Sequence, residues 1–487
     1  MSGGCATLAV VTDPHRPARR EGVPPSAFAA AEVARLTGGR LLLESQRPIR
    51  GVAVDSRRVR PGNAFLALAG ERTDGHRFLA EAVAAGAAAL LVSRPPEGTA
   101  ALAALGDVTV VQVPEPLAAL HALAAAWRAR FEPLVVGVTG SIAKTSTKEA
   151  IAAVLSRRWV TLRNEGNLNN EIGLPLTVLA LGPEHEALVV EMGMYTGGEI
   201  AALARIARPR IGVVTSVQAV HLARIGTLDA IEAAKGELVE ALPADGLAVL
   251  NADDPRVARM AARTVARTRT YGFDATADVT AESVESAGRA GMRFVLRIEG
   301  GLRQAVATPA LGRHAVHNAL AAAAVGLEAG LTLEQVAAGL ADGWTAPHRS
   351  ELVEAGGVLL LDDTYNASPG SMLAALELLA TLPGRRIAVL GEMLELGDGH
   401  EAGHRAVGAA AAGVVERLVV VGEGAAGIVQ GARAAGLHPS RIALVADRQA
   451  ALDLLHPLLA AGDAVLIKGS RGAALDLLVD RLREVLG

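Results

Sequence analysis

The stretch Thr139-Gly140-Ser141-Ile142-Ala143-Lys144-Thr145-Ser146 stands between an apolar run at residues 134–138 and a helix-favouring segment at 147–155. A buried strand, a short turn, a Lys-Thr pair and a helix together form the context of a phosphate-binding loop. Backbone N–H groups and the helix N-terminus favour anionic oxygens there. We predict that Lys144 supplies a point charge, that Thr145 ligates magnesium, and that a nucleotide contacts Gly140, Ser141, Ile142, Ala143, Lys144, Thr145 and Ser146.

Ala143 departs from the usual loop, in which glycine directly precedes the lysine. A methyl group at this position is expected to crowd the phosphates. An ordinary βα turn with an exposed lysine is the alternative, and the joint occurrence of strand, turn, Lys-Thr pair and helix argues against it. Motors, kinases, switches and ligases share such loops, so the neighbouring motifs must decide the function.

Two further polar residues follow apolar runs of the same region. Glu191 comes after residues 187–190, and His221 follows the run at 211–215. Because parallel strands end at one sheet edge, we expect both side chains beside the loop as magnesium ligands. Lys235 lies in a helical stretch at 231–242, and its spacing alone predicts a solvated helix residue.

Composition limits the classes of partner. The chain has 487 residues, which suggests about three domains at roughly 150 residues each. Only 2% of the residues are aromatic, so platforms for stacking nucleic-acid bases are scarce. A net charge of -4, with acids and bases interspersed, predicts small-molecule partners, with no nucleic acid and no membrane surface. The apolar runs fall short of the ~18 residues of a membrane helix.

The compartment is predicted from two features. Arg16, Arg19 and Arg20 follow a short apolar patch, which reverses the order of a secretory signal, so residues 1–25 are interpreted as a flexible extension. Cys5 is the single cysteine, which excludes an internal disulfide and a Cys-rich zinc site. A cytoplasmic protein is therefore expected, with a monomer as the default.

The order of apolar runs predicts an α/β fold of three domains. Residues 26–125 predict a small α/β domain, with strands at 49–55, 64–68 and 89–92 and a helix at 76–87. Residues 126–346 predict a mainly parallel sheet, with strands at 134–138, 187–190, 211–215 and 247–250. The alternating segments around Gly300-Gly301 predict an antiparallel hairpin appended to that sheet.

Residues 347–487 repeat strand then helix five times and predict a Rossmann-like, doubly wound domain. The expected strands are 358–361, 387–390, 418–421, 442–445 and 464–467. Gly422-Glu423-Gly424-Ala425-Ala426-Gly427, with Asp447 about 20 residues further on, satisfies the nicotinamide fingerprint and leaves an NAD-dependent oxidoreductase as an alternative. Its position after the third strand rather than the first disfavours that alternative.

Motifs in all three regions carry a resemblance to a known family. They include Asp55-Ser56-Arg57, Asp74-Gly75-His76, Gly166-Asn167-Leu168-Asn169-Asn170, Glu191-Met192-Gly193, Gly312-Arg313-His314-Ala315-Val316-His317-Asn318 and Lys468-Gly469-Ser470-Arg471. With these motifs the chain resembles the Mur ligases over nearly everything after about residue 28. The resemblance implies a UDP-sugar-binding domain at 26–125, an ATP-binding ligase domain at 126–346 and a Rossmann-like domain at 347–487.

The resemblance also implies roles for individual residues. Lys144, Glu191, His221 and Lys235 are expected to be catalytic, and two magnesium ions are expected on Thr145, Glu191, His221 and a carbamylated Lys235. ATP is expected to contact Asn318, at the adenine, and also Arg349, Asp363 and Tyr365. The substrate residues are expected to be Ser56, Arg57, Asn167, Asn170, Asn366 and Ser368. Ala315 stands where the family usually has asparagine.

The stretch Asp363-Thr364-Tyr365-Asn366-Ala367-Ser368-Pro369-Gly370-Ser371-Met372 looks like the branch of the family that adds a dipeptide. This implies ATP-dependent joining of D-alanyl-D-alanine to UDP-N-acetylmuramoyl-tripeptide through an acyl phosphate, in peptidoglycan precursor synthesis, with closure of the C-terminal domain on binding. Two alternatives stay open beside the oxidoreductase. One is a related ligase with another acid or amine, and the other is an inactive nucleotide-binding scaffold, motivated by Ala143.

Overall fold

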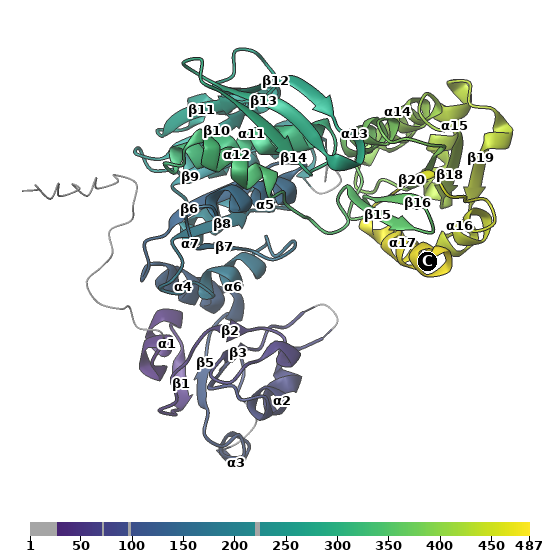
Figure 1. The fold of residues 1–487 in the computed structure, drawn as a ribbon. Coiled ribbons are helices and arrows are strands. Elements are labelled where there is room, and N and C mark those ends of the chain that lie inside the picture. Colours follow the sequence, from purple (N-terminus) through teal and green to yellow (C-terminus); the bar gives the residue numbers. More distant parts are fainter. Residues whose placement is uncertain (1–26, 71–72, 96–98, 220–224) are drawn as a thin grey trace, which may run out of the picture.

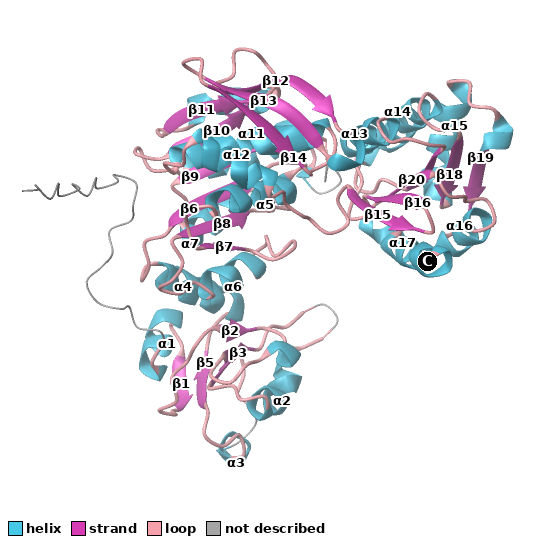
Figure 2. Ribbon diagram, in the orientation of Figure 1, coloured by secondary structure: helices cyan, strands magenta, loops and turns pink. Residues whose placement is uncertain are grey.

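The computed structural model describes residues 27–487 except 71–72, 96–98 and 220–224. The extension expected at residues 1–25 and the predicted ligand His221 therefore lie outside the described residues. Three sheets with their own helices follow one another along the chain, and the C-terminal one lies to the side of the other two (Figure 1). This arrangement confirms the α/β fold of three domains, in which helices cover mostly parallel strands (Figure 2).

The first sheet has five strands in the order β1-β5-β4-β3-β2, and only β1 is antiparallel to its neighbour. The strands are β1 (Arg40–Leu43), β2 (Val52–Ala53), β3 (Ala64–Leu66), β4 (Ala89–Val92) and β5 (Thr109–Gln112). The helices are α1 (Ala30–Thr37), α2 (Leu79–Ala84) and α3 (Thr99–Ala103). Strands β1 and β5 were not predicted, and β2 is shorter than the run at 49–55.

The central sheet has nine strands in the order β14-β13-β12-β11-β10-β9-β6-β8-β7. Its parallel part contains β6 (Leu134–Thr139), β7 (Thr161–Arg163), β8 (Ala187–Glu191), β9 (Ile211–Val214), β10 (Leu247–Asn251) and β11 (Arg267–Tyr271). The predicted hairpin is part of a three-stranded antiparallel extension of β12 (Val279–Ser286), β13 (Met292–Ile298) and β14 (Arg303–Thr308). Strand β12 joins this extension to β11 through a parallel pair.

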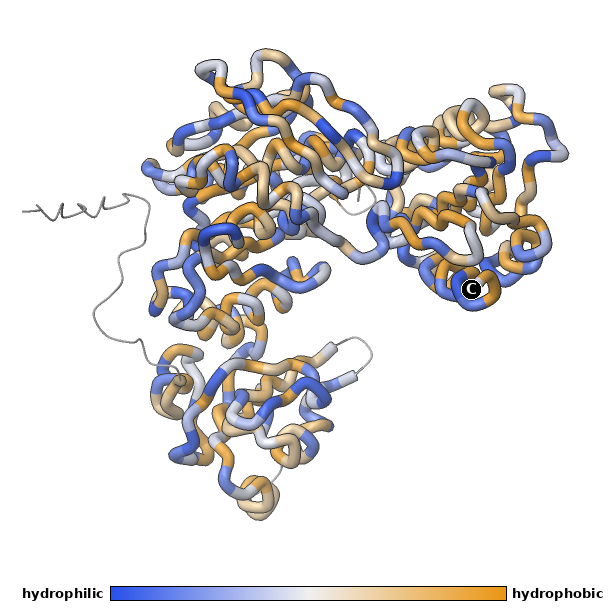
Figure 3. Tube along the Cα trace, in the orientation of Figure 1, coloured by the Kyte–Doolittle hydropathy of each residue, from blue (hydrophilic) through white to orange (hydrophobic). Residues whose placement is uncertain are grey.

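Helices cover both faces of the central sheet. One face packs against α4 (Pro116–Arg128), α6 (Gly173–Leu179), α7 (Glu199–Ala207) and α9 (Leu228–Glu240). The other packs against α5 (Lys144–Leu155), α11 (Arg313–Glu328) and α12 (Leu333–Ala341). The short α10 (Pro255–Ala258) and the 3-10 turn η3 (Arg259–Arg263) follow β10. Strands covered on both faces need apolar side chains at every position, which is why they appear as continuous hydrophobic runs in the sequence and in Figure 3.

The C-terminal sheet has six strands in the order β15-β16-β20-β17-β18-β19. They are β15 (Glu351–Ala355), β16 (Val358–Asp362), β17 (Arg386–Gly391), β18 (Arg417–Val421), β19 (Ile442–Val445) and β20 (Ala464–Lys468). Helices α13 (Pro369–Ala380), α14 (His400–Ala412) and α15 (Ala426–Ala434) cover one face, and α16 (Arg448–Leu455) and α17 (Asp476–Leu486) cover the other. The doubly wound prediction is confirmed, and the antiparallel edge strand β15 was not foreseen.

The junction between the central and C-terminal domains contains an unusual backbone. His348 and Ser350 both have positive φ values, 59° and 52°. Nδ1 of His348 lies 2.7 Å from Oδ2 of the buried Asp362. Burial is the largest single influence and opposes the charge on the ring, but the hydrogen bond to Asp362 and the negative charges of Asp362, Asp476 and Glu351 together raise the pKa of His348.

No helix among the described residues is long and apolar enough to cross a lipid bilayer.

The His348–Asp362 pair predicts a pH-dependent contribution to stability. Because the pKa of His348 is raised in the folded state, the stabilisation is complete below the unfolded pKa of about 6.5 and is lost as pH rises through the folded pKa. His348→Asn, which tolerates positive φ, is expected to lower the free energy of unfolding by less than about 1 kcal/mol near pH 6, with no loss near about pH 9. Thermal melts at both pH values measure this. The exposed His456, substituted in the same way, should give no such difference.

Candidate active site

A pocket of about 800 Å³ lies between the central and C-terminal domains. From the central domain it takes the loop residues 141–146, together with Asn167, Asn170, Glu191 and Asn318. From the junction and the C-terminal domain it takes Arg349, Asp363, Tyr365, Asn366 and Ser368. Most of the predicted nucleotide and substrate residues are therefore brought to one pocket, although they are spread over more than 200 positions of the chain.

The phosphate loop is held by the segment that follows β9. The amide of Ser141 donates to the carbonyl of Ser216 at 2.8 Å, and Oγ1 of Thr215 donates to the carbonyl of Ile142 at 2.6 Å. A Cβ atom added to Gly140 would lie 1.9 Å from Oγ1 of Thr215, so this position requires glycine. The neighbouring strand thus fixes the loop conformation without any ligand.

Lys144 lies folded over its own loop at the start of α5. Its Nζ donates to the carbonyl of Gly140 at 2.9 Å and to that of Ser141 at 3.3 Å. Burial lowers the pKa of Lys144, and the nearby Glu191 partly opposes this shift. An ammonium has three N–H donors, so one remains for a phosphate oxygen.

Ala143 has φ 65° and is the N-cap residue of α5. For a residue with a Cβ atom this left-handed conformation costs roughly 1–2 kcal/mol, whereas glycine adopts it freely. Alanine therefore replaces the usual glycine at a loop position whose left-handed backbone is unfavourable for any residue with a Cβ atom.

Glu191 ends β8 beside the loop, as predicted. Its Oε2 accepts a hydrogen bond from Oγ1 of Thr145 at 2.7 Å, and its Oε1 accepts one from Nδ2 of Asn169 at 2.6 Å. Its backbone N–H donates to Oδ1 of Asn164 at 2.9 Å. The carboxylate is therefore oriented from two sides and is buried.

These donors fit a magnesium ion. The hydroxyl of Thr145 and the carboxylate of Glu191 are hard oxygen ligands at contact distance from each other. Among the described residues no three His, Cys, Asp or Glu side chains form a metal cluster. Mg²⁺ commonly binds through one or two carboxylates plus phosphate oxygens and water, so such a cluster is not required.

Lys235 is buried in α9, which corrects the solvated position that its spacing predicts. Burial, together with the positive charge of Lys144, lowers the pKa of Lys235 well below its usual range. No ion pair of Lys235 is present within the described part of the chain. This shift favours the neutral, nucleophilic form of the ε-amine.

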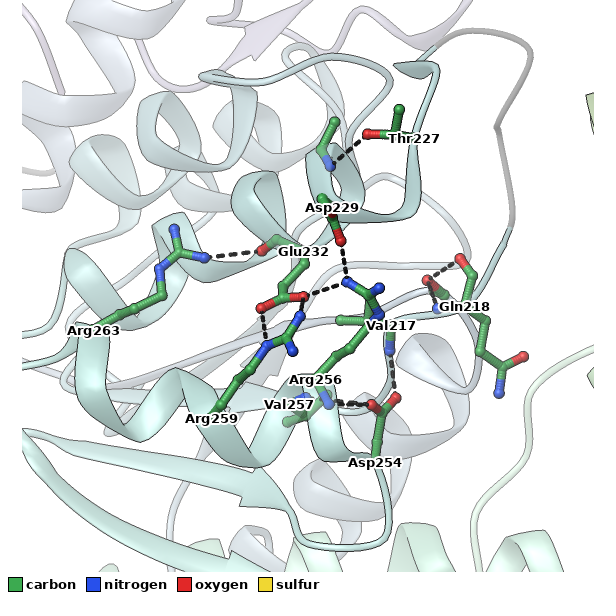
Figure 4. A network of polar contacts seen from close by, with 12 residues as sticks. Val217, Gln218, Thr227, Asp229, Glu232, Asp254, Arg256, Val257, Arg259 and Arg263 are labelled. Atoms are coloured by element: carbon green, nitrogen blue, oxygen red, sulfur yellow. Dashed lines mark hydrogen bonds and ion pairs between the residues drawn. The ribbon is translucent and has the colours of Figure 1, made fainter.

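The position of Lys235 is set by the anchoring of α9 at neighbouring residues. Glu232 is bound by Arg256 and Arg259, and the guanidinium of Arg263 donates to the carbonyls of Glu232 and Ala233 at 3.1 and 3.0 Å (Figure 4). The same guanidinium packs against Gly236. A Cβ atom added to Gly236 would lie only 2.0 to 2.5 Å from three atoms of the Arg263 guanidinium. The helix therefore carries glycine directly after Lys235 for a packing reason.

The predicted base and C-terminal residues take defined positions. Oδ1 of Asn318 accepts from Oγ1 of Thr147 at 3.1 Å, which places Asn318 against the helix of the phosphate loop. The guanidinium of Arg349 lies 3.9 Å from the ring centroid of Tyr365. Asp363 forms an ion pair of 2.7 Å with Lys468.

Two predicted substrate residues of the C-terminal domain have structural bonds of their own. The carbonyl of Asn366 accepts from Nζ of Lys468 at 2.9 Å. Ser368 caps α13, where it forms a capping box with Ser371. Both still line the pocket.

The pocket also takes polar residues that were not predicted as site residues, among them Asn169, His314 and Lys468. All three stand in motifs that the sequence displays, so the motifs were the available signal. Desolvation lowers the pKa of His314, which is partly buried, and its Nε2 lies 3.2 Å from Oγ of Ser350. Its bond to the junction segment depends on tertiary contact and is invisible in the sequence.

Ser56 and Arg57 lie in the N-terminal domain and do not line this pocket. Ser56 is buried and its Oγ donates to Oε1 of Glu81 at 3.0 Å. Arg57 is 81% exposed and pairs with Asp55. Their predicted role in binding a UDP-sugar stays a prediction.

The glycine-rich turn after β18 has its space filled. A Cβ atom on Gly424 would lie 2.4 Å from the carboxyl carbon of Glu392, so the Glu392 carboxylate lies against the turn. A carboxylate there repels an anionic pyrophosphate. The nicotinamide alternative therefore has no support from the geometry.

Family models match the chain in three consecutive segments. The Mur ligase family, catalytic domain, matches residues 48–128, the Mur ligase middle domain matches 138–326, and the Mur ligase, glutamate ligase domain, matches 348–471. The chain belongs to the Mur ligase family. This Mur ligase is thus an ATP-dependent, amide-bond-forming enzyme, as its motifs imply.

Individual relatives share nearly the whole length of this Mur ligase. UDP-N-acetylmuramoyl-tripeptide–D-alanyl-D-alanine ligase of Mycobacterium tuberculosis (strain ATCC 25618 / H37Rv) is 41% identical, with coverage of 93% of this chain and 97% of the relative. MurF of Acinetobacter baumannii superposes with a TM-score of 0.85 at 31% identity, and the match covers 95% of this chain and 100% of that structure. MurF ligase of Thermotoga maritima in complex with ADP superposes with a TM-score of 0.79 at 29% identity, and the match covers 90% of this chain and 98% of that structure.

The left-handed conformation of Ala143 predicts that Ala143→Gly stabilises the protein. Relief of roughly 1–2 kcal/mol of strain exceeds the ~0.4–1 kcal/mol by which glycine favours the unfolded chain, for a net gain of up to about 1 kcal/mol. The dissociation constant for ATP is also expected to fall, because the methyl group is removed from the phosphate side. Chemical denaturation and ATP titration measure the two effects. Ala153→Gly, within α5, is the control and should lose about 1 kcal/mol.

Proposed function

We propose that this Mur ligase joins D-alanyl-D-alanine to UDP-N-acetylmuramoyl-tripeptide, with ATP as the energy source, in cytoplasmic peptidoglycan precursor synthesis. The observation that carries the proposal is the single pocket in which the phosphate loop faces the stretch at residues 363–371. The printed name of the 41% identical relative, which states the same two substrates, supports it.

The chemistry follows from the weakness of a carboxylate as an acyl donor. An oxygen of the tripeptide carboxylate attacks the γ-phosphorus of ATP, so that an acyl phosphate forms and ADP leaves. The amine of D-alanyl-D-alanine then attacks the acyl carbon, the C–O bond to phosphate breaks, and the amine proton passes to solvent or a base. Phosphate is a far better leaving group than an unactivated carboxylate oxygen.

The residues of the pocket suit phosphoryl transfer, which depends on positioning and electrostatics. Lys144 lies where its remaining N–H can bind a phosphate oxygen. Thr145 and Glu191 would hold Mg²⁺, which supplies charge neutralisation when bound. Asn318 is proposed at the adenine side, and Asn167, Asn170, Asn366 and Ser368 are proposed to contact the peptide substrates.

Lys235 is proposed to act as its carbamate. A neutral amine attacks CO₂, an N–C bond forms and one proton leaves, so that a cation becomes a carboxylate-like oxygen ligand. Burial favours the neutral amine, and the positive charge of Lys144 favours both the neutral amine and the later anion. His221 is proposed as a further ligand from the segment outside the described residues, and Ser56 and Arg57 as contacts of the UDP moiety. A monomer suffices for this scheme.

The direct test measures phosphate release from ATP with Mg²⁺ and UDP-muramoyl-tripeptide, with and without D-alanyl-D-alanine, while mass spectrometry follows the nucleotide-linked pentapeptide. Release that requires both substrates and matches pentapeptide formation is expected. ATP binding without any turnover would favour the inactive scaffold, and turnover with a different acid or amine would favour a related ligase.

Carbamylation predicts a dependence on dissolved CO₂. In CO₂-depleted buffer the wild-type rate is expected to fall at least tenfold and to return on addition of bicarbonate. Lys235→Gln is expected to lose at least about 100-fold in kcat, in line with the loss of a metal ligand, and bicarbonate should not restore it. A wild-type rate that is indifferent to bicarbonate would contradict the carbamate.

A further inference from the structure

The chain contains 43 arginines and only 4 lysines. Arginine therefore serves at nearly every position that needs a positive charge. In the ion pairs described on the surface, the cation is an arginine and never a lysine. The four lysines are Lys144, Lys148, Lys235 and Lys468. Lys144 and Lys468 line the pocket, and Lys235 is the proposed carbamate. Lys148 alone has no role in the proposed reaction.

Lys148 is fully buried in α5, one helical turn after Lys144 and Thr145. Its Nζ donates to the carbonyl of Asn164 at 2.5 Å and to that of Gly166 at 3.3 Å. It also forms an ion pair of 2.8 Å with Glu149, which in turn accepts from Arg163. A buried cation needs such partners, and here they are the backbone of one specific turn.

That turn leads directly to the magnesium ligand. Asn164 is fully buried; its Oδ1 accepts the backbone N–H of Glu191 at 2.9 Å, and its Nδ2 donates to the carbonyl of Leu168 at 3.0 Å. Asn169, next in the chain, donates from Nδ2 to Oε1 of Glu191 at 2.6 Å. Two asparagines that flank the turn held by Lys148 therefore orient the main chain and side chain of Glu191.

The same helix approaches Glu191 from the other side. Oγ1 of Thr145 donates to Oε2 of Glu191, three residues before Lys148. One turn of helix α5 therefore acts on both oxygens of the Glu191 carboxylate. Thr145 binds one oxygen directly. Lys148 holds the segment at residues 164–169, whose Asn169 side chain binds the other. A guanidinium, planar and longer, would not fit a site with no exposed surface, which accounts for lysine here.

We propose that Lys148 is a positioning residue for the reaction: it couples the phosphate-loop helix to the asparagine-rich turn and so fixes the Glu191 carboxylate and Asn169 for Mg²⁺ and nucleotide. Lys148 itself does not line the pocket. The expected effect of Lys148 on the ligation rate rests on the proposed function. The expected effect of Lys148 on the binding of Mg²⁺ and ATP can be measured without ligation.

The test compares Lys148→Met with wild type, since methionine keeps the length of the side chain and removes the ammonium. Titration calorimetry of ATP at increasing Mg²⁺ is expected to show the half-saturating Mg²⁺ concentration raised at least tenfold, with ATP binding in the absence of Mg²⁺ within about twofold of wild type. The kcat of pentapeptide formation is expected to fall about 10- to 100-fold, as for a misplacement of about 1 Å. KM for D-alanyl-D-alanine should stay unchanged.

A double-mutant cycle separates positioning from general damage. Lys148→Met, Asn169→Ala and the double variant are expected to share one defect, so the double variant should shift the Mg²⁺ requirement no more than the larger single change. Arg405→Met, which removes an exposed helical ion pair with Glu401, is the matched control and should change neither binding nor rate. If Lys148→Met does not fold, Lys148→Gln, which is shorter and uncharged, serves as the second variant with the same expected Mg²⁺ shift.

Two results would overturn the proposal. One is an unchanged Mg²⁺ requirement in a folded Lys148 variant, and the other is multiplication of the two single effects in the double variant. A wild type that binds MgATP but forms no pentapeptide would count against the proposed function, while the calorimetric cycle would still decide the role of Lys148.

Discussion

The parallel pairing of β6 with β8 and β9 is the constraint on which the site depends. In this register Val138 lies opposite Glu191, and Thr139 lies opposite Val214. The phosphate loop, the carboxylate and the segment that holds the loop therefore leave the sheet at the same edge. A shift of one residue would turn Glu191 to the other face of the sheet, since side chains alternate along a strand.

The buried lysines explain how the protein tolerates cations before an anionic ligand binds. Lys144 and Lys148 place their ammonium groups on backbone carbonyls, whereas Lys235 lowers its pKa. Hydrogen bonds offset desolvation in the first two cases, and in the third the lowered pKa favours the uncharged form. ATP enters a region in which hydrogen-bond donors already stand in place, which is the condition for electrostatic stabilisation of a transferring phosphoryl group.

Some features were accessible from sequence because they depend on local patterns. Buried parallel strands such as β8 and β10 are apolar at every position and were predicted with nearly correct bounds. The short or edge strands β1, β7 and β15 were missed, because they mix polar and apolar residues and gain their order from a neighbouring strand. The motifs further indicated the pocket residues of the C-terminal domain, although the network of Lys468 with Asp363 and Asn366 required the fold.

By itself the sequence determined the phosphate loop, the three α/β domains and the family, since each follows from residue order and short-range periodicity. Only the tertiary structure decided that Lys235 is buried, that Ala143 is left-handed, and that Lys148 binds the turn beside Glu191. The physical reason is that burial and hydrogen-bond partners come from segments distant along the chain. A lysine has the same side chain on a solvated helix and in a dry interior, and only its neighbours determine its charge and its role.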